Sequence, residues 1–404
     1  PRRADDHSPF KGLCGAGVAF KLCAALDGCP PEEMLEYCGD LAAVGTVADV
    51  MPLTGENRTI VKAGLRQLQN TDRPGFCALL EEVGLAGKPV TAENISYAIA
   101  PRLNAAGRMD SAVTALQLVL CEDEDRAEEL AHKLSDINIQ RQETEMEIVK
   151  AAQELLDAEP ERLEDRVILL WGRDWHPGVI GIVASRVTER FGKPSIVISV
   201  DGEEARGSGR SVEGFSLFQA VSACSDLLER FGGHPMAAGV TLKPEDVALF
   251  RQRINQYAAE ACPEMPAQVL RLDCRLNPGA LSPEMPQSLE PLEPFGSGNP
   301  QPLFGLYGME LREIVPVGGG NHLRLVCAKK GAMLTCMCFG VKPEEFPFVP
   351  GETLDLAVTL EAREFRGEAQ LTVSVREAKL SGLDMDQCIH TYRVYEKLQR
   401  GEAL

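Results

Sequence analysis

The sequence lacks the apolar segments of membrane and secreted proteins. No stretch of the 404 residues approaches the roughly 18 uninterrupted apolar residues that a membrane span requires, and the N-terminus leads into no apolar signal core. The composition, 44% hydrophobic with only 5% aromatic residues, excludes disordered, collagen-like and coiled-coil chains. We therefore expect a cytoplasmic protein without a membrane partner.

Metal-binding cysteine pairs are also missing. The 13 cysteines are odd in number, scattered and mostly set in apolar runs, and no CxxC pair occurs among them. The closest pair, Cys336 and Cys338, would point to one face of a strand. We expect reduced, buried thiols, because neither a disulfide framework nor a structural zinc site fits this spacing.

An initiator methionine is absent as well. Pro1 is followed by a polar, charged stretch and then by an apolar run of helical spacing, which is typical of the middle of a domain. We therefore expect an N-terminally truncated chain.

Acidic residues outnumber basic residues, 60 to 41, and the formal net charge is −19. Much of the excess lies in residues 122–166, which contain 16 acidic and 6 basic residues. Apolar residues recur there at spacings of three and four, which predicts a long helix over residues 122–158. This helix is either a solvated connection between domains or an arm that binds a partner.

At roughly 100–200 residues per domain, the length allows two to four domains. Residues 1–121 carry mainly helical periodicity. The region 159–262 alternates strand and helix patterns and is expected to be an α/β domain that starts with a βαβ unit. Its predicted strands cover residues 167–171, 195–200 and 236–242, and its predicted helices cover residues 177–190, 216–231 and 244–259.

Residues 268–380 alternate apolar and polar positions in short runs separated by Gly and Pro. The predicted strands cover residues 269–273, 323–327, 334–339, 354–360 and 370–375. Short strands in this number favour a small closed barrel, for which the oligonucleotide-binding (OB) fold is the commonest five-stranded solution. Residues 381–404 form a tail with a terminal helix over 388–400, so the fold class is multidomain α/β plus β.

Residues 100–108, Ala-Pro-Arg-Leu-Asn-Ala-Ala-Gly-Arg, set two cations and an amide among small side chains. Small residues let a backbone approach a ligand closely, and the planar guanidinium group matches a phosphate. Arg102, Asn104 and Arg108 are therefore candidate phosphate or DNA ligands. Because Pro101 breaks helices, the alternative is a solvated helix cap.

Two segments of the α/β domain carry anion-binding chemistry. His176 lies at a strand-to-helix turn, where the first-turn amides of the following helix point outward. Residues 206–211, Arg-Gly-Ser-Gly-Arg-Ser, follow a strand and combine flexible backbone with hydroxyl and guanidinium groups. Ser208, Arg210 and Ser211 therefore suit a terminal phosphate. The alternatives are a capping histidine and a plain turn.

Two further positions combine polar groups with apolar surroundings. Gly232, Gly233 and His234 lie between a predicted helix and an apolar strand, and paired glycines indicate close approach of a substrate backbone. Asp49 lies in the otherwise apolar residues 45–53, and a buried acid needs a partner. That partner is either a divalent metal or a set of hydrogen-bond donors.

Six segments in this order resemble the RecJ single-stranded-DNA exonucleases of the DHH phosphoesterase superfamily. They cover residues 45–53, 100–108, 175–186, 207–211, 231–239 and 292–300, the last with the sequence Leu-Glu-Pro-Phe-Gly-Ser-Gly-Asn-Pro. The resemblance implies 5′→3′ degradation of single-stranded DNA in repair and recombination, with Mn²⁺ or Mg²⁺ as the cofactor. It implies single-stranded DNA as the substrate, and a single-strand-binding protein or a helicase as a partner.

The resemblance also implies roles for individual residues. Asp49 matches the family's last metal-ligating aspartate, which makes it the catalytic and metal candidate. Arg102 and Arg108 fall on the motif that faces the substrate strand, Ser208 and Arg210 fall where the family grips the 5′-phosphate, and His234 ends a Gly-Gly-His signature. The family's other aspartates and its Asp-His-His triplet have no counterpart in this sequence. We therefore expect a chain that binds DNA but hardly cleaves it.

The implied domains are a remnant of a DHH α/β domain (1–121), a long connecting helix (122–158), a DHHA1 α/β domain (159–262), an OB-fold barrel (268–380) and a tail (381–404). The barrel would offer a groove in which bases stack on Phe304, Tyr307, Phe339 or Phe365, although each of these could equally belong to the barrel core. The barrel has a net charge of only −3, so the acidic total does not exclude DNA.

Two other functions stay open at this point. A DHH phosphodiesterase of nanoRNA or cyclic dinucleotides is one, although such relatives usually end after the DHHA1 domain and the barrel therefore argues against it. A non-catalytic nucleic-acid-binding or scaffold module is the other, and it would apply if the N-terminus were natural.

Overall fold

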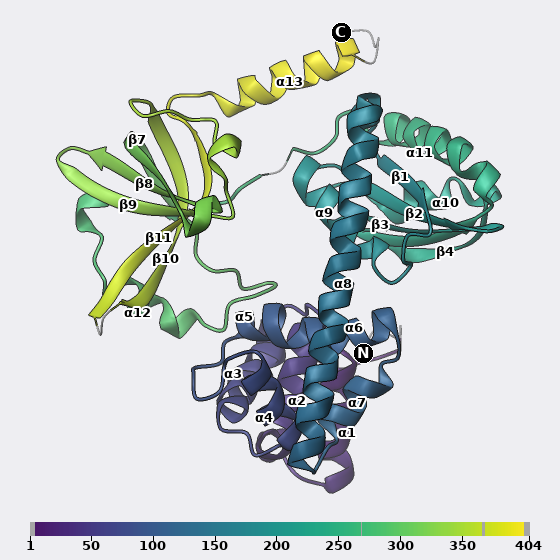
Figure 1. The fold of residues 1–404 in the computed structure, drawn as a ribbon, viewed down its shortest axis with the longest axis vertical. Coiled ribbons are helices and arrows are strands. Elements are labelled where there is room, and N and C mark those ends of the chain that lie inside the picture. Colours follow the sequence, from purple (N-terminus) through teal and green to yellow (C-terminus); the bar gives the residue numbers. More distant parts are fainter. Residues whose placement is uncertain (1–4, 268, 366–367, 400–404) are drawn as a thin grey trace. The chain divides into compact units, whose positions relative to one another are not determined.

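A computed structural model of the chain describes residues 5–267, 269–365 and 368–399 (Figure 1). The chain divides into two compact units. The first comprises residues 1–71, 87–100 and 270–385, and the second comprises residues 72–86, 101–269 and 386–404. Within the described ranges, no helix is both long and apolar enough to cross a membrane.

The N-terminal part of the first unit is built from helices, as its periodicity predicts. They are α1 (Gly15–Asp27), α2 (Pro31–Ala48), α3 (Gly55–Gln69) and the short α5 (Ala92–Asn94), which continues into a π-helical turn at Ile95–Ile99. Helices α2 and α3 pack closely because Gly64 has no side chain. A Cβ atom at Gly64 would lie 2.2 Å from the carbonyl oxygen of Gly39 and 2.4 Å from Ala43 Cβ.

Gly64→Ala should therefore lower the free energy of unfolding. The added methyl group meets backbone and not a flexible side chain, so α2 and α3 must separate at a cost of about 1–3 kcal/mol. Urea titration measures this cost. Gly107→Ala is the control, because a Cβ atom there meets only Ala112 Cβ at 3.5 Å and helix propensity favours alanine. Equal losses in the two variants would contradict the packing argument.

The first unit also contains a closed β-barrel, which confirms the predicted fold class. Its strands are β6 (Cys274–Arg275), β7 (Phe304–Val317), β8 (His322–Lys329), β9 (Ala332–Phe339), β10 (Thr353–Phe365) and β11 (Glu368–Leu380), with the short helix α12 (Met285–Leu289) between β6 and β7. The sheet order is β10-β11-β9-β8-β7-β6, and pairing of β10 with β7 closes the five long strands into a barrel. Leu306, Leu325 and Leu354 are fully buried in its core.

The strand predicted over residues 269–273 is wrong. In this part of the chain the ladder with β7 consists of Cys274 and Arg275 alone, and residues 269–273 are not assigned to a strand. The backbone amide of Asp273 donates to Leu303 O at 2.8 Å, and the Asp273 carboxylate accepts from the Leu303 amide at 2.8 Å. This reciprocal pair fixes the start of the ladder, which the alternation of side chains alone could not reveal.

None of the thirteen cysteines, which all lie within the described residues, forms a disulfide, as predicted, but their burial is only partly as predicted. Five are buried, among them Cys327, Cys336 and Cys338 in the barrel core. Cys23, Cys77, Cys274 and Cys388 are exposed.

The second unit contains a five-stranded sheet with helices on both faces. Its strands are β1 (Ile168–Arg173), β2 (Ser195–Asp201), β3 (Glu204–Arg210), β4 (Leu228–His234) and β5 (Ala237–Leu242), in the order β1-β2-β3-β5-β4. Its helices are α4 (Pro74–Glu82), α6 (Ala100–Met109), α7 (Val113–Val119), α8 (Glu124–Ala158), α9 (Ile180–Phe191), α10 (Leu217–Ser222), α11 (Val247–Ala261) and α13 (Met385–Gln399). Strands β1 and β2 are parallel and flank α9 in the sequence, which is the predicted βαβ unit.

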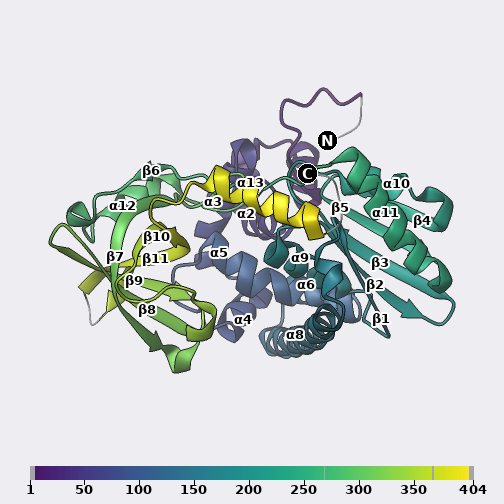
Figure 2. The same ribbon diagram turned by 90° about the horizontal axis from the view of Figure 1, so that it is seen from above.

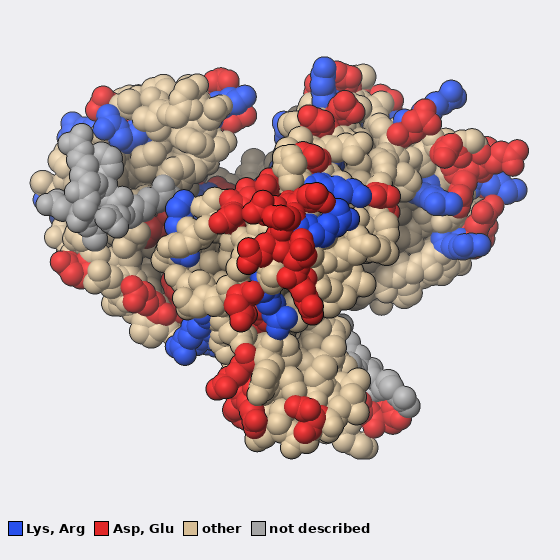
Figure 3. Space-filling model, turned by 60° about the horizontal axis from the view of Figure 1, so that its bottom comes forward, with Lys and Arg blue, Asp and Glu red and all other residues tan. Residues whose placement is uncertain are grey.

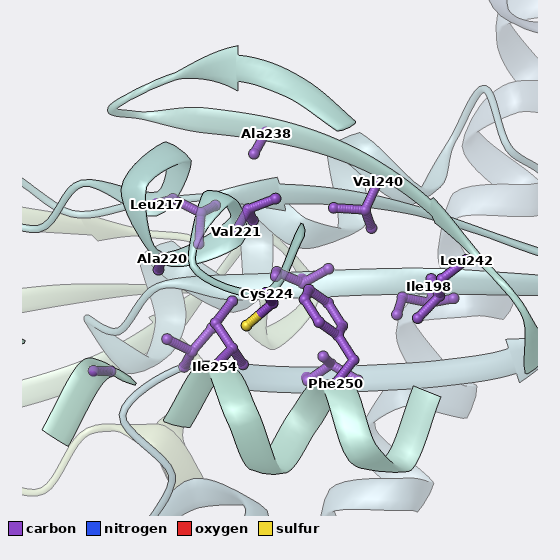
Figure 4. Close-up of a cluster of buried hydrophobic side chains, with 14 of the residues drawn as sticks. Ile198, Leu217, Ala220, Val221, Cys224, Ala238, Val240, Leu242, Phe250 and Ile254 are labelled. Carbon is purple, nitrogen blue, oxygen red and sulfur yellow. The ribbon is translucent and has the colours of Figure 1, made fainter. Parts of the chain in front are cut away.

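Helices cover both faces of the sheet (Figure 2), and each face buries an apolar cluster. Helix α9 and the C-terminal part of α8 pack on one face, where Ile148 and Val183 join Ile168 in a buried cluster. Helices α10 and α11 pack on the other face, and Figure 4 shows Phe250 of α11 among the side chains of that cluster. The sheet is therefore buried on both sides, which explains its continuous apolar strands.

Helix α8 extends over 35 residues. It begins where the side chain of Asp123 accepts a hydrogen bond from the Arg126 amide at 2.8 Å, which is an N-cap. Its outward face carries exposed acidic residues from Glu124 to Asp157, and Figure 3 shows a dense band of acidic side chains on the face it displays. Its inward face buries the polar residues Ser135 and Glu145 besides apolar ones.

Two predicted local structures are wrong. The helix predicted over residues 216–231 ends at Ser222, and residues 228–234 form the edge strand β4, because pairing with β5 outweighs the helical spacing. Pro101 does not break a helix but lies in the first turn of α6, directly after the π-helical turn. The chain is helical without a break from Ala92 to Met109, so Pro101 lies inside a helical run, and the π-helical turn directly before it accommodates the proline ring and the missing N–H.

Candidate functional site

Strand β3 carries the polar residues that were expected to follow a strand as a flexible segment. Alternate side chains of a strand point to opposite faces, so Ser208 and Arg210 share one face while Gly207 and Gly209 face the apolar core. A Cβ atom at Gly207 would lie 2.7 Å from Val240 Cγ2, so a larger residue would not fit there. Arg210 Nη1 donates to Ser208 Oγ at 3.3 Å. The glycines thus serve packing and not flexibility, which corrects the expectation of a flexible segment after a strand.

The N-terminus of α9 lies against this polar face of β3. A Cβ atom at Gly181 would be 2.9 Å from Ser208 Oγ and 3.4 Å from Arg210 Nη2. Helix α9 begins at Ile180, three residues after the predicted start at Pro177. The amides of Val179 and Ile180 donate to His176 O, and that of Ile182 donates to Val179 O, so α9 adds mainly the partial positive charge of its N-terminus next to the hydroxyl and the guanidinium group.

Arg108, at the C-terminal end of α6, reaches the turn before α9. Its Nη1 donates to Gly178 O at 3.2 Å. The two backbones also touch, since a Cβ atom at Gly178 would lie 2.2 Å from Arg108 O. The absence of a side chain at Gly178 is therefore what lets α6 approach the turn that leads into α9.

Helix α8 contributes one buried carboxylate to the same region. Glu145 is 2% exposed and forms ion pairs with Arg141, one helical turn before it, and with Arg186 of α9. Arg141 Nη2 also donates to Asn138 Oδ1 at 2.8 Å. We call Arg108, Arg141, Arg186 and Arg210 together the arginine cluster.

The electrostatics of the arginine cluster favour an anion. Burial lowers the pKa of Arg210, and the charge of Arg108 lowers it further. Burial also lowers the pKa of Arg108, with Arg141 lowering it further and Glu145 raising it. Arg108 thus experiences repulsion from Arg141 and itself opposes the charge of Arg210, with Glu145 as the neighbouring carboxylate. A bound phosphate would relieve this repulsion.

The sequence missed Arg141, Glu145 and Arg186 as members of this cluster. Arg141 and Glu145 are four residues apart on α8 and therefore neighbours on its surface. Arg186 lies five residues after Gly181 on α9. The available signal is a charged residue at a core-facing position of the long helix, as Glu145 is, and this position does not fit a wholly solvated connection.

The other predicted residues of α6 and β3 have different surroundings. Arg102 Nε donates to Ser135 Oγ of α8 at 2.8 Å, and burial lowers the pKa of Arg102. Asn104 is exposed. The hydroxyl of Ser211 is buried and donates to Phe215 O at 2.8 Å, so it closes the chain turn after β3.

Two histidines adopt the same local structure. His176 Nδ1 accepts a hydrogen bond from the Gly178 amide at 3.1 Å, and His234 Nδ1 accepts one from the Met236 amide at 3.3 Å. Each histidine precedes a proline and accepts from the residue two positions on. A neutral ring whose Nδ1 accepts must carry its proton on Nε2, so both rings present an N–H donor at their outer nitrogen.

The paired glycines before His234 belong to β4, which forms a hairpin with β5. Gly233 has φ 151°, and a Cβ atom there would lie 2.2 Å from Ala237 O. A Cβ atom at Gly232 would meet nothing within 4 Å. Gly233 is thus required by the hairpin itself, whereas Gly232 leaves open surface beside it.

Asp49 is the C-cap of α2 and is exposed, which contradicts the expectation of a buried acid. Val50 follows it with φ 53° and turns the chain out of the helix. Within residues 5–399, apart from the gaps noted above, no group of three or more His, Cys, Asp and Glu side chains could hold a metal ion. The described residues therefore do not fit a complete divalent-metal site around Asp49.

The aromatic candidates of the barrel fall into different classes. Phe304 is buried in the core. Tyr307 is half-buried, with the guanidinium carbon of Arg275 5.2 Å from its ring centroid. Phe339 is 39% exposed. The side chain of Phe365 lies outside the described residues. Tyr307 and Phe339 are therefore the two accessible rings among these candidates.

Comparison with known proteins adds two family matches and several relatives. Residues 164–260 match the DHHA1 domain, and residues 272–377 match the RecJ OB domain. The single-stranded-DNA-specific exonuclease RecJ of Bacillus subtilis is 36% identical over 94% of this chain and 48% of its own length. The same-named protein of Escherichia coli is 33% identical over 93% of this chain and 68% of its own length.

A solved structure is also similar. The crystal structure of RecJ in complex with Mg²⁺ from Thermus thermophilus matches with a TM-score of 0.79 and 35% identity, covering 93% of this chain and 57% of that one. The chain spans about half the length of the first curated relatives it matches.

Proposed function

Because the chain belongs to the RecJ family of single-stranded-DNA-specific exonucleases, we propose that it takes part in metal-dependent 5′→3′ degradation of single-stranded DNA. Its share of this activity is to bind the strand and hold the terminal 5′-phosphate. A single-strand-binding protein or a helicase is the proposed partner in repair and recombination.

The observation that carries the proposal is the convergence of Ser208, Arg210 and the first turn of α9. These groups offer a hydroxyl, a planar guanidinium fork and the partial positive charge of a helix N-terminus within one small region. A terminal phosphate has more charge and more free oxygens than a phosphate inside a strand, so it gains most from such a set of donors. Arg108 adds charge without needing a specific oxygen.

Divalent ions in such enzymes activate water and neutralise the charge that grows on phosphorus. Since the described residues do not fit a complete metal site, we assign them no hydrolytic step. Their proposed contribution is orientation, because a strand held by its terminal phosphate has a fixed scissile bond. We expect this chain alone to bind DNA with little cleavage, and Asp49 to contribute only together with further ligands.

The test is a titration with a labelled single strand that carries or lacks a 5′-phosphate, at one moderate salt concentration and without metal. We expect tighter binding of the phosphorylated strand. Equal binding of the two strands would refute the phosphate site. An unlabelled dinucleotide serves as a competitor. If the chain binds the dinucleotide more tightly than a long strand, a phosphodiesterase of short substrates is favoured.

The shared histidine geometry gives a prediction within this proposal. Glutamine places its amide nitrogen near the position of imidazole Nε2, whereas asparagine places it near Nδ1. If His176 donates through Nε2 to the strand, His176→Gln should bind within about threefold of the original chain and His176→Asn should bind roughly tenfold more weakly. Fluorescence anisotropy measures both. Equal losses in the two variants would mean that His176 only shapes the turn.

A further inference from the structure

The segment of residues 292–300 is not explained by phosphate binding. It is a loop of the first unit that closes on itself: Asn299 Nδ2 donates to Leu292 O at 2.8 Å and to Pro294 O at 2.9 Å. The backbones of Gly296 and Asn299 exchange hydrogen bonds of 2.9 and 3.1 Å. Such bracing gives the loop a defined shape before it contacts anything else.

Arg58 of α3 binds this loop through three main-chain carbonyl groups. Its Nη1 donates to Leu292 O at 2.8 Å, and its Nη2 donates to Pro291 O at 2.9 Å and to Glu293 O at 2.7 Å. A guanidinium group is suited to this role because its donors form a rigid planar fork. The contact does not depend on the side chains of the loop, only on the path of its backbone.

The loop also packs on the turn between α2 and α3. The Leu53 amide donates to Ser297 O at 2.6 Å. A Cβ atom at Gly296 would lie 2.7 Å from Leu53 Cδ1, and one at Gly298 would lie 2.8 Å from Pro52 Cβ. Both glycines are therefore needed for close approach. Leu53 itself is 2% exposed.

We propose that Arg58 and this loop form a latch that fastens the barrel to the turn following Asp49. The loop leads directly into β7, the strand that pairs with both β6 and β10, so holding the loop holds the barrel. Arg58 is then a positioning residue: it touches no substrate, but it fixes where a strand bound on the barrel can run. This role in strand binding rests on the proposed function, whereas the latch itself does not.

The latch is tested first without DNA. In Arg58→Ala, the amide of Leu53 should exchange with deuterium at least tenfold faster, because its acceptor Ser297 O is no longer held in place. Arg58→Lys keeps the charge but has one side-chain nitrogen. Its Leu53 amide should exchange at a rate between those of the original chain and of Arg58→Ala. Arg66→Ala is the matched control, as an exposed arginine of the same helix. Unchanged exchange at Leu53 in Arg58→Ala would overturn the latch.

The functional readout is the dependence of affinity on strand length. A barrel that is no longer fastened adds less to the binding of a long strand, since its effective concentration falls. We expect Arg58→Ala to lose roughly tenfold in affinity for a 5′-phosphorylated strand of about 20 nucleotides and little for one of about 6. Asn299→Ala removes the hydrogen bonds that the Asn299 side chain donates within the loop. It should likewise lose affinity for the long strand and little for the short one.

The outcomes separate the latch from the proposed function. If the original chain fails to prefer a 5′-phosphate, the phosphate site is wrong, but the exchange of the Leu53 amide still reports on the latch. If Arg58→Ala binds both strand lengths as the original chain does, Arg58 does not position the barrel for DNA.

Discussion

Replacing Arg210 by alanine should weaken binding of a 5′-phosphorylated single strand by roughly 10–100-fold and leave binding of the 5′-hydroxyl strand nearly unchanged. A hydrogen bond to a charged group is worth about 1.5–3 kcal/mol, which sets this range. Arg210 is the residue to change because its guanidinium group lies against Ser208 and the first turn of α9, the proposed position of the terminal phosphate. Anisotropy titrations with the two strands measure the difference directly.

Arg206→Ala is the matched control for Arg210→Ala. Arg206 lies on the same strand and on the same face, four residues away, and its replacement by alanine removes the same charge. Its guanidinium group pairs with Glu204 at the surface and is 59% exposed, so it is not part of the arginine cluster. If both variants lose the same affinity for both strands, the effect is long-range charge and the specific phosphate contact is wrong.

The type and order of most elements could be predicted from the sequence, but the role of several polar residues could not. Helix α8 and the βαβ unit follow from local periodicity, which packing then only confirms. The Gly-Ser-Gly-Arg run of β3 indicates a flexible segment after a strand, because glycine and serine favour loops and turns locally. Glycine is required at positions 207 and 209 of the strand because residues of the neighbouring strands and of α10 leave no room for a side chain there. These neighbours are distant in the sequence, so the run itself does not reveal them.

The same limit applies to Arg58 and Glu145. An arginine at the start of an amphipathic helix is normally a solvated residue, and nothing near Arg58 in the sequence indicates that three carbonyl groups of residues 291–293 accept its hydrogen bonds. Contacts between residues more than 200 positions apart are decided by tertiary packing. The motif of residues 292–300 could be recognised, but its partner could not.

Glu145→Gln should lower the free energy of unfolding by about 3 kcal/mol, at the lower end of the range for breaking a buried ion pair. Glu145 is 2% exposed and the side chain of Arg141 is 11% exposed, so Arg141 would keep its charge with no carboxylate beside it. The pair with Arg186 adds little, because the side chain of Arg186 is 59% exposed and water screens it. Urea denaturation measures the loss.

Glu147→Gln provides the control, since Glu147 lies two residues further on the same helix and is exposed. It removes the same charge without unpairing a buried arginine, so its effect on stability should stay within about 0.5 kcal/mol. A loss in Glu147→Gln equal to that in Glu145→Gln would mean that net helix charge, and not the buried pair, sets the result.

Affinity for phosphate should change in the opposite direction to stability. Without its one carboxylate, the arginine cluster of the folded Glu145→Gln chain carries more unbalanced positive charge, so inorganic phosphate should bind it more tightly and stabilise it more than the original chain. If Glu145 had only a structural role, the Glu145→Gln chain would lose both stability and affinity for phosphate. Thermal unfolding in rising phosphate therefore separates the two roles: a larger phosphate-induced rise in Tm for Glu145→Gln supports a carboxylate that balances an anion site, and a smaller rise refutes it.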